Sequence, residues 1–315
     1  MSNPGAKSSL GKPDHGTARS YFLNGQDVAV RQLAAGLYLV ATPIGNLGDI
    51  SLRALETLAG ADAIACEDTR VTGKLLERYG IRASLTPYHE HNAAAARPKI
   101  LERLAAGAAI ALVSDAGTPL ISDPGFKLVQ ATQEAGYPVT AIPGASSVLT
   151  ALAVSGLPTD RFFFEGFLPA KQAARRERAA VLARIPATLV LFETGPRLAA
   201  ALEDLSETFG GRMAAICREL TKLHEEVRRG TVSELAEHYA QGGETRGEFV
   251  IVIAPPNEDE KSASTEDIDA LLRQTLRETS LKDAVATVAE ATGAPRKDIY
   301  RRALQLVKDD GEAHE

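Results

Sequence analysis

Two Ser-Asp pairs, at 114–115 and 122–123, lie in one short stretch of the sequence together with two glycines and two prolines. The stretch follows the apolar run 108–113, which predicts a buried parallel strand, and precedes 126–131, which has the apolar spacing of a helix. A loop in this position lies at the carboxyl end of its strand, where open α/β sheets bind ligands. Its side chains are short and polar, and its glycines allow close backbone approach to a bound molecule. We therefore interpret 113–125 as a ligand-binding loop in preference to an ordinary connection.

Charged and polar residues follow two further predicted strands. The apolar run 61–66 ends in Glu-Asp-Thr-Arg at 67–70, and the short strand 84–88 ends in His-Glu-His-Asn at 89–92. Two carboxylates beside an arginine suit an ion-paired helix cap and a polar site equally well. The His-x-His pair has no third ligand at a suitable spacing, so we expect no metal there. It fits the polar wall of a substrate cleft, or a capped loop before the helix 93–106.

Two more loops stand at the carboxyl ends of predicted strands. One follows the first strand of the sheet and has the sequence Thr-Pro-Ile-Gly-Asn-Leu-Gly-Asp at 42–49. It lacks the Walker lysine pattern and the dinucleotide fingerprint, so a helix-capping loop is as good an interpretation as a phosphate loop. The other, Pro-Gly-Ala-Ser-Ser at 143–147, follows the strand 137–142. Either serine can cap the next helix, and the free N–H groups at a helix start favour an acceptor-rich ligand.

Strands and helices alternate from 36 to 157, which is the pattern of a parallel sheet with crossover helices. The carboxyl ends of parallel strands share one edge, so we expect the loops 42–46, 114–119 and 143–147 to converge on one cleft. Gly-Leu-Pro at 156–158 marks a boundary, after which closely spaced strands predict a mixed sheet. The strands of this second unit are expected at 162–167, 187–192, 212–217, 225–232 and 247–254.

Composition is that of a globular protein, and the length of 315 residues suggests about two domains. The net charge of −6 excludes a uniformly basic nucleic-acid binder, so any such contact must depend on local patches. Two widely separated cysteines form neither a disulfide framework nor a zinc spacing, which indicates a reducing cytosol. No apolar run is long enough to span a membrane. Residues 1–33 show no clear periodicity, and we expect a disordered tail.

Two segments carry local positive charge. The segment 171–184 holds five basic residues and one acidic residue, which suits a solvated helix face or a phosphate contact. Near the C-terminus, 273–308 holds eight basic and four acidic residues, and its two predicted helices, 281–291 and 295–307, have helix-turn-helix spacing. A helical hairpin that docks on the protein itself is an equal alternative. An acidic linker at 257–269, with six acidic residues and one lysine, precedes this module.

Together these motifs resemble those of the tetrapyrrole (corrin/porphyrin) methylase superfamily, and within it the group that methylates small-subunit ribosomal RNA. The resemblance extends from about Leu37 into the C-terminal module. The matching runs are Thr-Pro-Ile-Gly-Asn-Leu at 42–47, Glu-Asp-Thr-Arg at 67–70, His-Glu-His-Asn at 89–92, Ser-Asp-Ala-Gly-Thr-Pro at 114–119, Asp-Pro-Gly at 123–125, Pro-Gly at 143–144, Gly-Leu-Pro-Thr-Asp-Arg-Phe at 156–162, Glu-Gly-Phe-Leu-Pro at 165–169 and Arg-Glu-Leu-Thr-Lys at 218–222.

The resemblance implies two α/β domains of the class III S-adenosylmethionine methyltransferase type, at 34–157 and 158–256. The acidic linker and a helix-turn-helix-like module at 270–315 follow them. It also implies S-adenosylmethionine in the cleft between the domains, and a cytoplasmic homodimer. The implied reaction methylates the ribose 2′-hydroxyl of a cytidine in the decoding region of 16S rRNA, within the 30S subunit, with neither a metal nor a membrane.

Site residues are carried over from the matching motifs. The implied cofactor-binding residues are Pro43, Ser114, Asp115, Gly117, Thr118, Pro143, Gly144 and Ser146. The acceptor side is expected at Asp68, Arg70, His91, Asn92, Arg218 and Lys222. A ribose hydroxyl is a poor acid, so a base such as Glu67, His89 or Glu219 takes its proton, or positioning suffices with late proton loss to water. A tetrapyrrole methylase on the same fold and a non-catalytic RNA-binding protein remain as alternatives.

Overall fold

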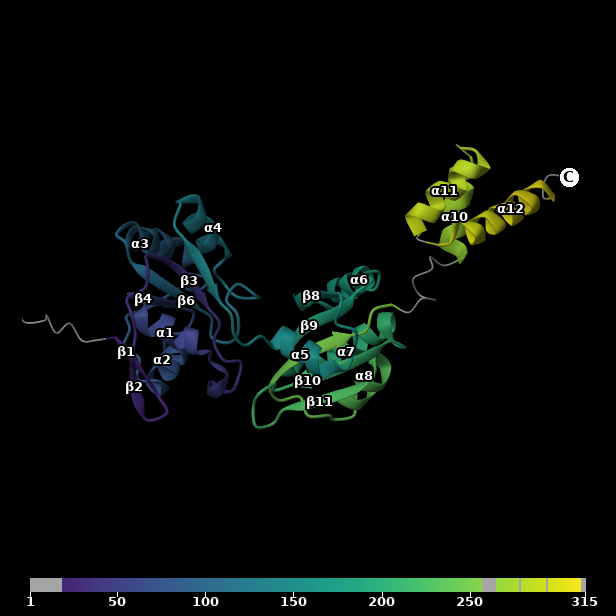
Figure 1. The fold of residues 1–315 in the computed structure, drawn as a ribbon. Helices are drawn as coiled ribbons and strands as arrows, with labels where there is room; N and C mark the ends of the chain where they lie inside the picture. Colours follow the sequence, from purple (N-terminus) through teal and green to yellow (C-terminus); the bar gives the residue numbers. More distant parts are fainter. Residues whose placement is uncertain (1–18, 257–264, 278, 293, 313–315) are drawn as a thin grey trace, which may run out of the picture. The chain divides into compact units, whose positions relative to one another are not determined.

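Figure 1 shows the fold in a computed structural model, which describes residues 19–256, 265–277, 279–292 and 294–312. The chain forms two compact units that divide between Thr150 and Ala151, with 220–222 belonging to the first. The division falls inside helix α5 (Ser147–Ser155), upstream of the boundary that the Gly-Leu-Pro run predicts. The residues of α5 are mostly apolar along the whole helix, so its sequence does not indicate that a unit ends within it.

The first unit is built on a parallel sheet. Its strands lie in the order β5-β4-β6-β3-β7, and every neighbouring pair runs parallel, as the alternation of strands and helices predicts. The loops after β3, β4, β6 and β7 therefore leave the sheet at the same edge. The strands are β3 (Gly36–Val40), β4 (Ala63–Cys66), β5 (Leu85–Pro87), β6 (Ala109–Val113) and β7 (Val139–Ile142). The other helices are η1 (Leu47–Asp49), α1 (Leu52–Gly60), α2 (Thr69–Arg78), α3 (Ala93–Ala105) and α4 (Phe126–Glu134).

Local sequence explains these elements. Every residue of β6 is apolar and buried, as a central parallel strand requires. Its alternate residues pack into two cores, one that includes α1 and α2 and one that includes α3 and α4, so both faces of the sheet are covered. Ser51 accepts a hydrogen bond from the Ala54 N–H and begins α1. Asp68 does the same for the Arg70 N–H and begins α2.

A β-hairpin precedes the sheet, formed by β1 (Ser20–Leu23) and β2 (Gln26–Ala29). The expected disordered tail at 1–33 is therefore wrong for this segment, while residues 1–18 lie outside the described residues. Asn24 and Gly25 form the turn with φ angles of 49° and 83°, and an Asn-Gly pair is the strongest short-range hairpin signal. Tyr21 is buried in the core beside α1 and α2, so the hairpin is an integral part of the first unit.

The second unit contains a mixed sheet in the order β11-β10-β12-β9-β8. Only the pair of β8 and β9 is parallel among the strand pairs that the structure describes in this sheet, which confirms the mixed sheet that the sequence predicts. The strands are β8 (Phe162–Phe167), β9 (Thr188–Thr194), β10 (Met213–Arg218), β11 (Glu226–Thr231) and β12 (Glu248–Ile253). The helices are α6 (Gln172–Leu182), α7 (Gly195–Phe209) and α8 (Val232–Ala240).

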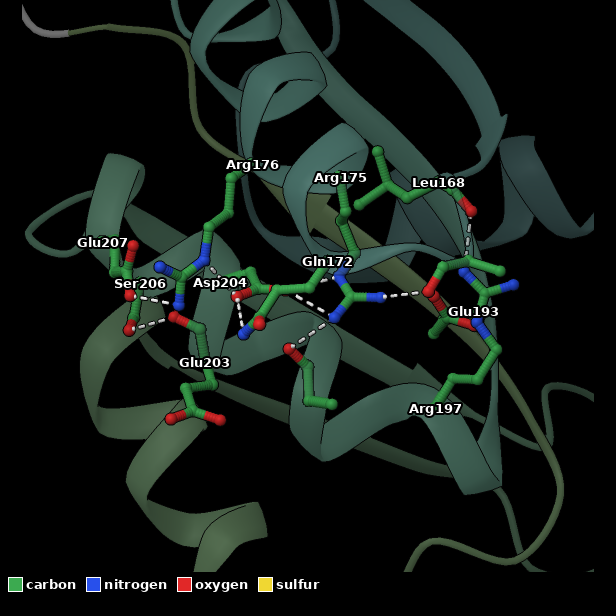
Figure 2. A network of polar contacts seen from close by, with 12 residues as sticks. Leu168, Gln172, Arg175, Arg176, Glu193, Arg197, Glu203, Asp204, Ser206 and Glu207 are labelled. Atoms are coloured by element: carbon green, nitrogen blue, oxygen red, sulfur yellow. Dashed lines mark hydrogen bonds and ion pairs between the residues drawn. The ribbon is translucent and has the colours of Figure 1, made fainter.

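A network of arginines and carboxylates joins α6 to α7 (Figure 2). Asp204 is fully buried, and its carboxylate accepts hydrogen bonds from Arg175 Nε at 2.7 Å and Arg176 Nε at 2.6 Å. Arg178, on the same helix, pairs with Glu165 of β8, with Nη2 and Oε2 2.6 Å apart. The segment 171–184 is positive in sequence, but carboxylates from other elements neutralise these three arginines. The structure thus assigns them to internal pairs and not to a free phosphate-binding face.

The C-terminal module is a set of three helices, α10 (Thr265–Leu276), α11 (Leu281–Thr292) and α12 (Arg296–Glu312). They share a core of their own, whose buried members are Leu272, Val285, Val288, Ala289, Ile299, Ala303 and Leu306. The expected linker at 257–269 is therefore too long, because α10 begins at Thr265, and its residues 257–264 lie outside the described residues. None of the described helices combines the length and apolar character needed to cross a bilayer.

Candidate functional site

Three of the strand-end loops in the first unit are tied together. The Thr42 N–H donates to the Gly117 carbonyl at 2.9 Å, and the Gly117 N–H donates back to Thr42 at 3.1 Å. The Thr118 hydroxyl donates to the Ala145 carbonyl at 3.3 Å. These bonds join the loops after β3, β6 and β7, so the loops 42–46, 114–119 and 143–147 meet as expected, while the cleft that they were expected to form stays a prediction.

Glycines let the loop backbones approach one another. Gly117 has a φ of 79°, and a Cβ atom there would lie 3.3 Å from the Ile44 side chain. A Cβ atom on Gly144 would lie 3.0 Å from the Ala41 Cβ atom, so a side chain at either position would push two loops apart. Pro43 is half-buried beside these contacts, whereas Pro143 and Gly144 are exposed.

Two serines predicted to contact a cofactor have local partners instead. The Ser114 side chain is buried, and its hydroxyl donates to the Ala116 and Gly117 carbonyls at 3.2 Å each. Ser146 accepts a hydrogen bond from the Leu149 N–H at 3.4 Å and caps α5. The Ser114 hydroxyl is thus used within its own loop, whereas the Ser146 hydroxyl accepts one bond and keeps its proton to donate.

Carboxylates gather where the loops after β4 and β6 meet. Asp115 accepts a hydrogen bond from the Asp68 N–H at 3.0 Å, which places it beside Glu67 and Asp68. Burial raises the pKa of Glu67, the charges of Asp115 and Asp68 raise it further, and His89 partly offsets them. Burial also raises the pKa of Asp115, although its bond to the Asp68 N–H lowers it. These two carboxyl groups therefore hold a proton more readily than usual.

Asp123 joins the same group, and sequence reasoning did not assign it a role. Burial raises its pKa to about 6, Glu67 and Asp115 add to the shift, and the Ser114 hydroxyl opposes it. The preceding residues Leu120 and Ser122 have φ angles of 77° and 62°, which L-residues seldom adopt. The second Ser-Asp pair and the Asp-Pro-Gly run were the available signals, but nothing in the sequence shows that this loop turns back toward Glu67.

Asp68 and Arg70 form an ion-paired helix cap. The Asp68 carboxylate accepts from the Arg70 N–H at 2.8 Å and lies 2.6 Å from Arg70 Nη2. Hydrogen bonds from Arg70 lower the pKa of Asp68 to about 2, so this carboxyl group is ionised throughout the neutral range. The Arg70 side chain is otherwise 86% exposed. Asp68 thus positions the start of α2, and Arg70 keeps an open guanidinium edge.

His89, His91 and Asn92 occupy the loop after β5. The Asn92 side chain accepts from the His89 N–H at 2.9 Å and donates to the Pro87 carbonyl at 3.0 Å, so it holds the loop in shape. The two imidazole rings lie edge to face with centroids 6.1 Å apart. His89 Nδ1 is buried and finds no hydrogen-bond partner among the residues that the structure describes. Across those residues, no group of three or more His, Cys, Asp or Glu side chains is arranged to hold a metal ion.

The remaining predicted residues lie at and after the end of β10. Glu219 has a φ of 49°, and its carboxylate accepts from the Glu248 N–H at 3.0 Å. The Arg218 guanidinium donates to the Arg246 carbonyl at 2.8 Å. Both side chains thus have partners within the second unit, whereas Lys222 belongs to the segment 220–222 of the first.

Two family models match the chain. The model described as tetrapyrrole (corrin/porphyrin) methylases matches residues 36–236, and the model described as the RsmI C-terminal HTH domain matches 262–307. The chain is 50% identical over 287 residues to the ribosomal RNA small subunit methyltransferase I of Mesorhizobium japonicum, covering 91% of this chain and 97% of that one. It is 52% identical over 282 residues to the protein of that name from Erythrobacter litoralis, covering 89% and 98%.

Solved structures show the same fold at low identity. The methyltransferase CobJ matches with a TM-score of 0.53 and 18% identity, over 70% of this chain and 94% of that one. A diphthine synthase matches with a TM-score of 0.53 and 18% identity, over 71% and 92%. The chain belongs to the tetrapyrrole (corrin/porphyrin) methylase family.

Proposed function

From its membership of this family, we propose that the chain is an S-adenosylmethionine-dependent methyltransferase of small-subunit rRNA. The observation that carries the proposal is the set of relatives named ribosomal RNA small subunit methyltransferase I, 42–52% identical over 84–91% of this chain. The proposed acceptor is the ribose 2′-hydroxyl of a cytidine in the decoding region of 16S rRNA, within the 30S subunit. This finer assignment rests on the motif resemblance at 67–70, 89–92 and 218–222.

The loop edge of the first unit fits the proposed cofactor. S-adenosylmethionine supplies an electrophilic methyl group on a sulfonium, and it carries an amino acid group and an adenosine. Ala116, Thr118, Pro143 and Gly144 are exposed at this edge, beside loops that glycines allow to pack closely, which suits recognition of a polar molecule at the strand ends. The half-buried Asp115 adds negative charge beside these groups, which suits a cation. Thr118, on the same loop, is exposed.

Of the three candidate bases, Glu67 has the environment that fits the role best. Its pKa is raised by burial and by Asp115, which makes it a stronger proton acceptor than an ordinary carboxylate. Asp68 is committed to Arg70, and one oxygen of Glu219 already accepts from the Glu248 N–H. His89 lies close enough to Glu67 to lower its pKa and thus stabilises the carboxylate form. Glu67 takes the hydroxyl proton, while the surrounding loops orient the reactants.

The proposal includes a homodimer and a cytoplasmic location, where 30S subunits are found. Both cysteines are buried and free, which fits a reducing compartment. Burial raises the pKa of Cys66, and it raises that of Cys217 to about 12, so neither thiol is available as a nucleophile at neutral pH. The proposed chemistry therefore leaves the cysteines in the core and places the reaction at the loop edge. Light scattering of the purified chain tests the dimer.

Methyl transfer from labelled S-adenosylmethionine to 30S subunits, free 16S rRNA and 50S subunits tests the function. We expect label in 16S rRNA from 30S subunits and none in 50S subunits. A ribose 2′-O-methyl group blocks alkaline cleavage at its own nucleotide, so the labelled position should survive as an alkali-resistant dinucleotide that begins with cytidine. Label on a base, or on a tetrapyrrole and not on RNA, would overturn the proposal. RNA binding without any transfer would favour the non-catalytic alternative.

A further inference from the structure

One side of α12 remains uncovered when the C-terminal module forms its core. The residues of α12 buried against α10 and α11 are Ile299, Ala303 and Leu306. Tyr300, Leu304 and Val307 are instead 48%, 46% and 51% exposed. Residues four and seven positions apart lie on one side of a helix, so these three form a continuous apolar strip. α12 thus has two apolar sides, of which the module's core uses one.

Cations border this strip. Arg296 stands one turn before Tyr300, and Lys297 and Arg301 follow the strip along one side, as the 3.6-residue period requires. Arg296 and Lys297 are exposed and make no ion pair with any residue that the structure describes. Arg301 pairs with Asp298 at 2.7 Å, but its side chain is 70% exposed, and such surface pairs are weak. Two unpaired cations, Arg296 and Lys297, and the weakly paired Arg301 therefore lie along the apolar strip.

Arg302, on the same helix, differs from these cations because it has a buried carboxylate as its partner. Arg302 lies toward α10, where its Nε donates to Asp269 at 2.6 Å, and Asp269 is buried. Hydrogen bonds from Arg302 lower the pKa of Asp269. This pair stabilises the module, so the positive charge of Arg302 is internally compensated. On the opposite side of α12, Arg301 has only the exposed Asp298 as a partner, and Arg296 and Lys297 pair with no carboxylate among the described residues.

From this arrangement we infer that the exposed side of α12 is a binding surface for single-stranded RNA. This surface, which we call the Tyr300 face, consists of Arg296, Lys297, Tyr300, Arg301, Leu304 and Val307. The Tyr300 ring stacks on an unpaired base, Leu304 and Val307 extend the apolar platform, and the cations contact the flanking phosphates. The inference rests on the proposed function, which supplies an rRNA substrate.

The chemistry of the face selects this occupant. Single-stranded nucleic acids are bound by aromatic stacking platforms lined with positive charge, whatever the base sequence. A second copy of the chain would present the same cations, and like charges would oppose the contact. Size also argues against a stable protein interface. A helix of 17 residues is roughly 26 Å long and 10 Å wide, so one side offers on the order of 250 Å², whereas a stable interface needs about 800 Å² from each partner.

Substitutions at Tyr300 in the full-length chain separate stacking from apolar packing. Tyr300→Ala should weaken binding to 30S subunits and to unstructured 16S rRNA fragments about tenfold, the loss expected for one stacked base. Tyr300→Phe keeps the ring and should bind as the original chain does. Tyr300→Leu keeps apolar bulk without a π-face and should bind as weakly as the alanine variant. Full affinity in the leucine variant, or no loss in the alanine variant, would overturn the inference.

Substitutions of the cations test the phosphate contacts. Each lost contact should reduce the slope of log affinity against log salt concentration by about 0.7, the value for single strands. Lys297→Ala and Arg301→Ala should each show this reduction, and the double variant should show about twice as much. Lys282→Ala, at an exposed position on α11, is the matched control and should leave the slope unchanged. Equal effects from all three lysine and arginine variants would show a diffuse charge effect and would refute a defined face.

Further measurements distinguish a failure of this inference from a failure of the proposed function. The KM for 30S subunits should rise in Tyr300→Ala while kcat and cofactor affinity stay unchanged, because the face contacts RNA and not the reacting atoms. If the unmodified chain transfers no methyl group, the proposed function fails, while the binding series still decides the role of the face. If Tyr300→Ala alters the oligomeric state by light scattering and leaves the affinity for RNA unchanged, the face binds a second copy and the inference fails.

Discussion

The α6–α7 network of the second unit and the strand-end loops of the first unit both contain carboxylates whose pKa values are shifted, but the shifts have opposite signs. Burial alone would raise the pKa of Asp204, yet hydrogen bonds from Arg176, Gln172 and Arg175 outweigh it and lower the pKa. At the loop edge, Glu67 and Asp123 have no such arginine, and their pKa values are raised. Asp204 is fully buried and Glu67 and Asp123 are only partly buried, so it is the arginine partners, and not the degree of burial, that make the pKa of Asp204 the lower one.

This difference separates a structural role from a chemical one. A carboxylate locked between guanidinium groups stays ionised, so it can fix two helices but cannot exchange a proton near neutral pH. A carboxyl group pressed against other carboxyl groups retains a proton that it can give up or take back, and such groups concentrate at functional sites. The comparison therefore assigns chemistry to the first unit's loop edge and anchoring to the α6–α7 network.

The largest effect is expected from removing the anchor. Asp204→Ala leaves Arg175 buried, with 6% of its side chain exposed and no counter-charge, which should destabilise the chain by about 3–5 kcal/mol. Denaturant unfolding measures the change. Glu203→Ala, at the neighbouring exposed position shown in Figure 2, is the control and should cost little. Methyl transfer measured well below the unfolding midpoint should be unchanged in Asp204→Ala, and a specific loss of turnover there would contradict the division of roles.

A smaller effect, on rate and not on stability, is expected at the loop edge. Glu67→Gln keeps the size of the side chain and removes the proton acceptor, so kcat should fall about a hundredfold, within the usual range for a general base. Cofactor affinity by calorimetry should stay unchanged. Glu77→Gln, an exposed position on α2, is the matched control. Full turnover in Glu67→Gln would show that positioning with late proton loss to water is sufficient.

The sequence predicts where the strand-end loops lie, but it does not predict the hydrogen-bond partners of their side chains. The order of strands and helices predicts that the loops 114–119 and 143–147 meet, because parallel strands end at one edge. It does not predict that Ser114 turns its hydroxyl into its own loop, or that Asp123 returns to the carboxylate group. The return of Asp123 accompanies left-handed backbone at Leu120 and Ser122, where the sequence has no glycine as a signal.

Long-range pairing explains the other differences. The charge of 171–184 looked available because its carboxylate partners, Asp204 and Glu165, lie elsewhere in the sequence. The Asn-Gly pair at 24–25 indicates a hairpin turn, but strands of four residues are stable only when their apolar face has a partner, and the sequence does not show that partner. The sequence pattern thus determines elements and edges, while tertiary contacts determine which charges remain free.

The smallest expected effect is the contribution of Asp123 to the pH dependence of stability. It tests the comparison between the two kinds of carboxylate most directly. Its folded pKa of about 6 lies above the ordinary value of 3.8, so the native state is favoured when this group is protonated. That contribution is fully present below about pH 3.8 and is lost as the pH rises through about 6. Asp123→Asn abolishes the titration, so the variant should gain stability relative to the original chain between pH 4 and pH 7. We expect about 1 kcal/mol after allowing for solvent screening at this half-exposed site.

Asp68→Asn provides the opposite sign on the neighbouring loop. Its folded pKa of about 2 lies below 3.8, so ionised Asp68 stabilises the native state above pH 3.8, and this contribution fades as the pH falls through about 2. Asp68→Asn should therefore be less stable than the original chain at pH 7, whereas Asp123→Asn should be more stable. Urea unfolding of the three proteins across this pH range measures both differences. If the stability of both variants changed in the same direction at pH 7, pairing with Arg70 would not explain the difference between Asp68 and Asp123. The contrast between anchored and proton-holding carboxylates would then not apply within the loop edge.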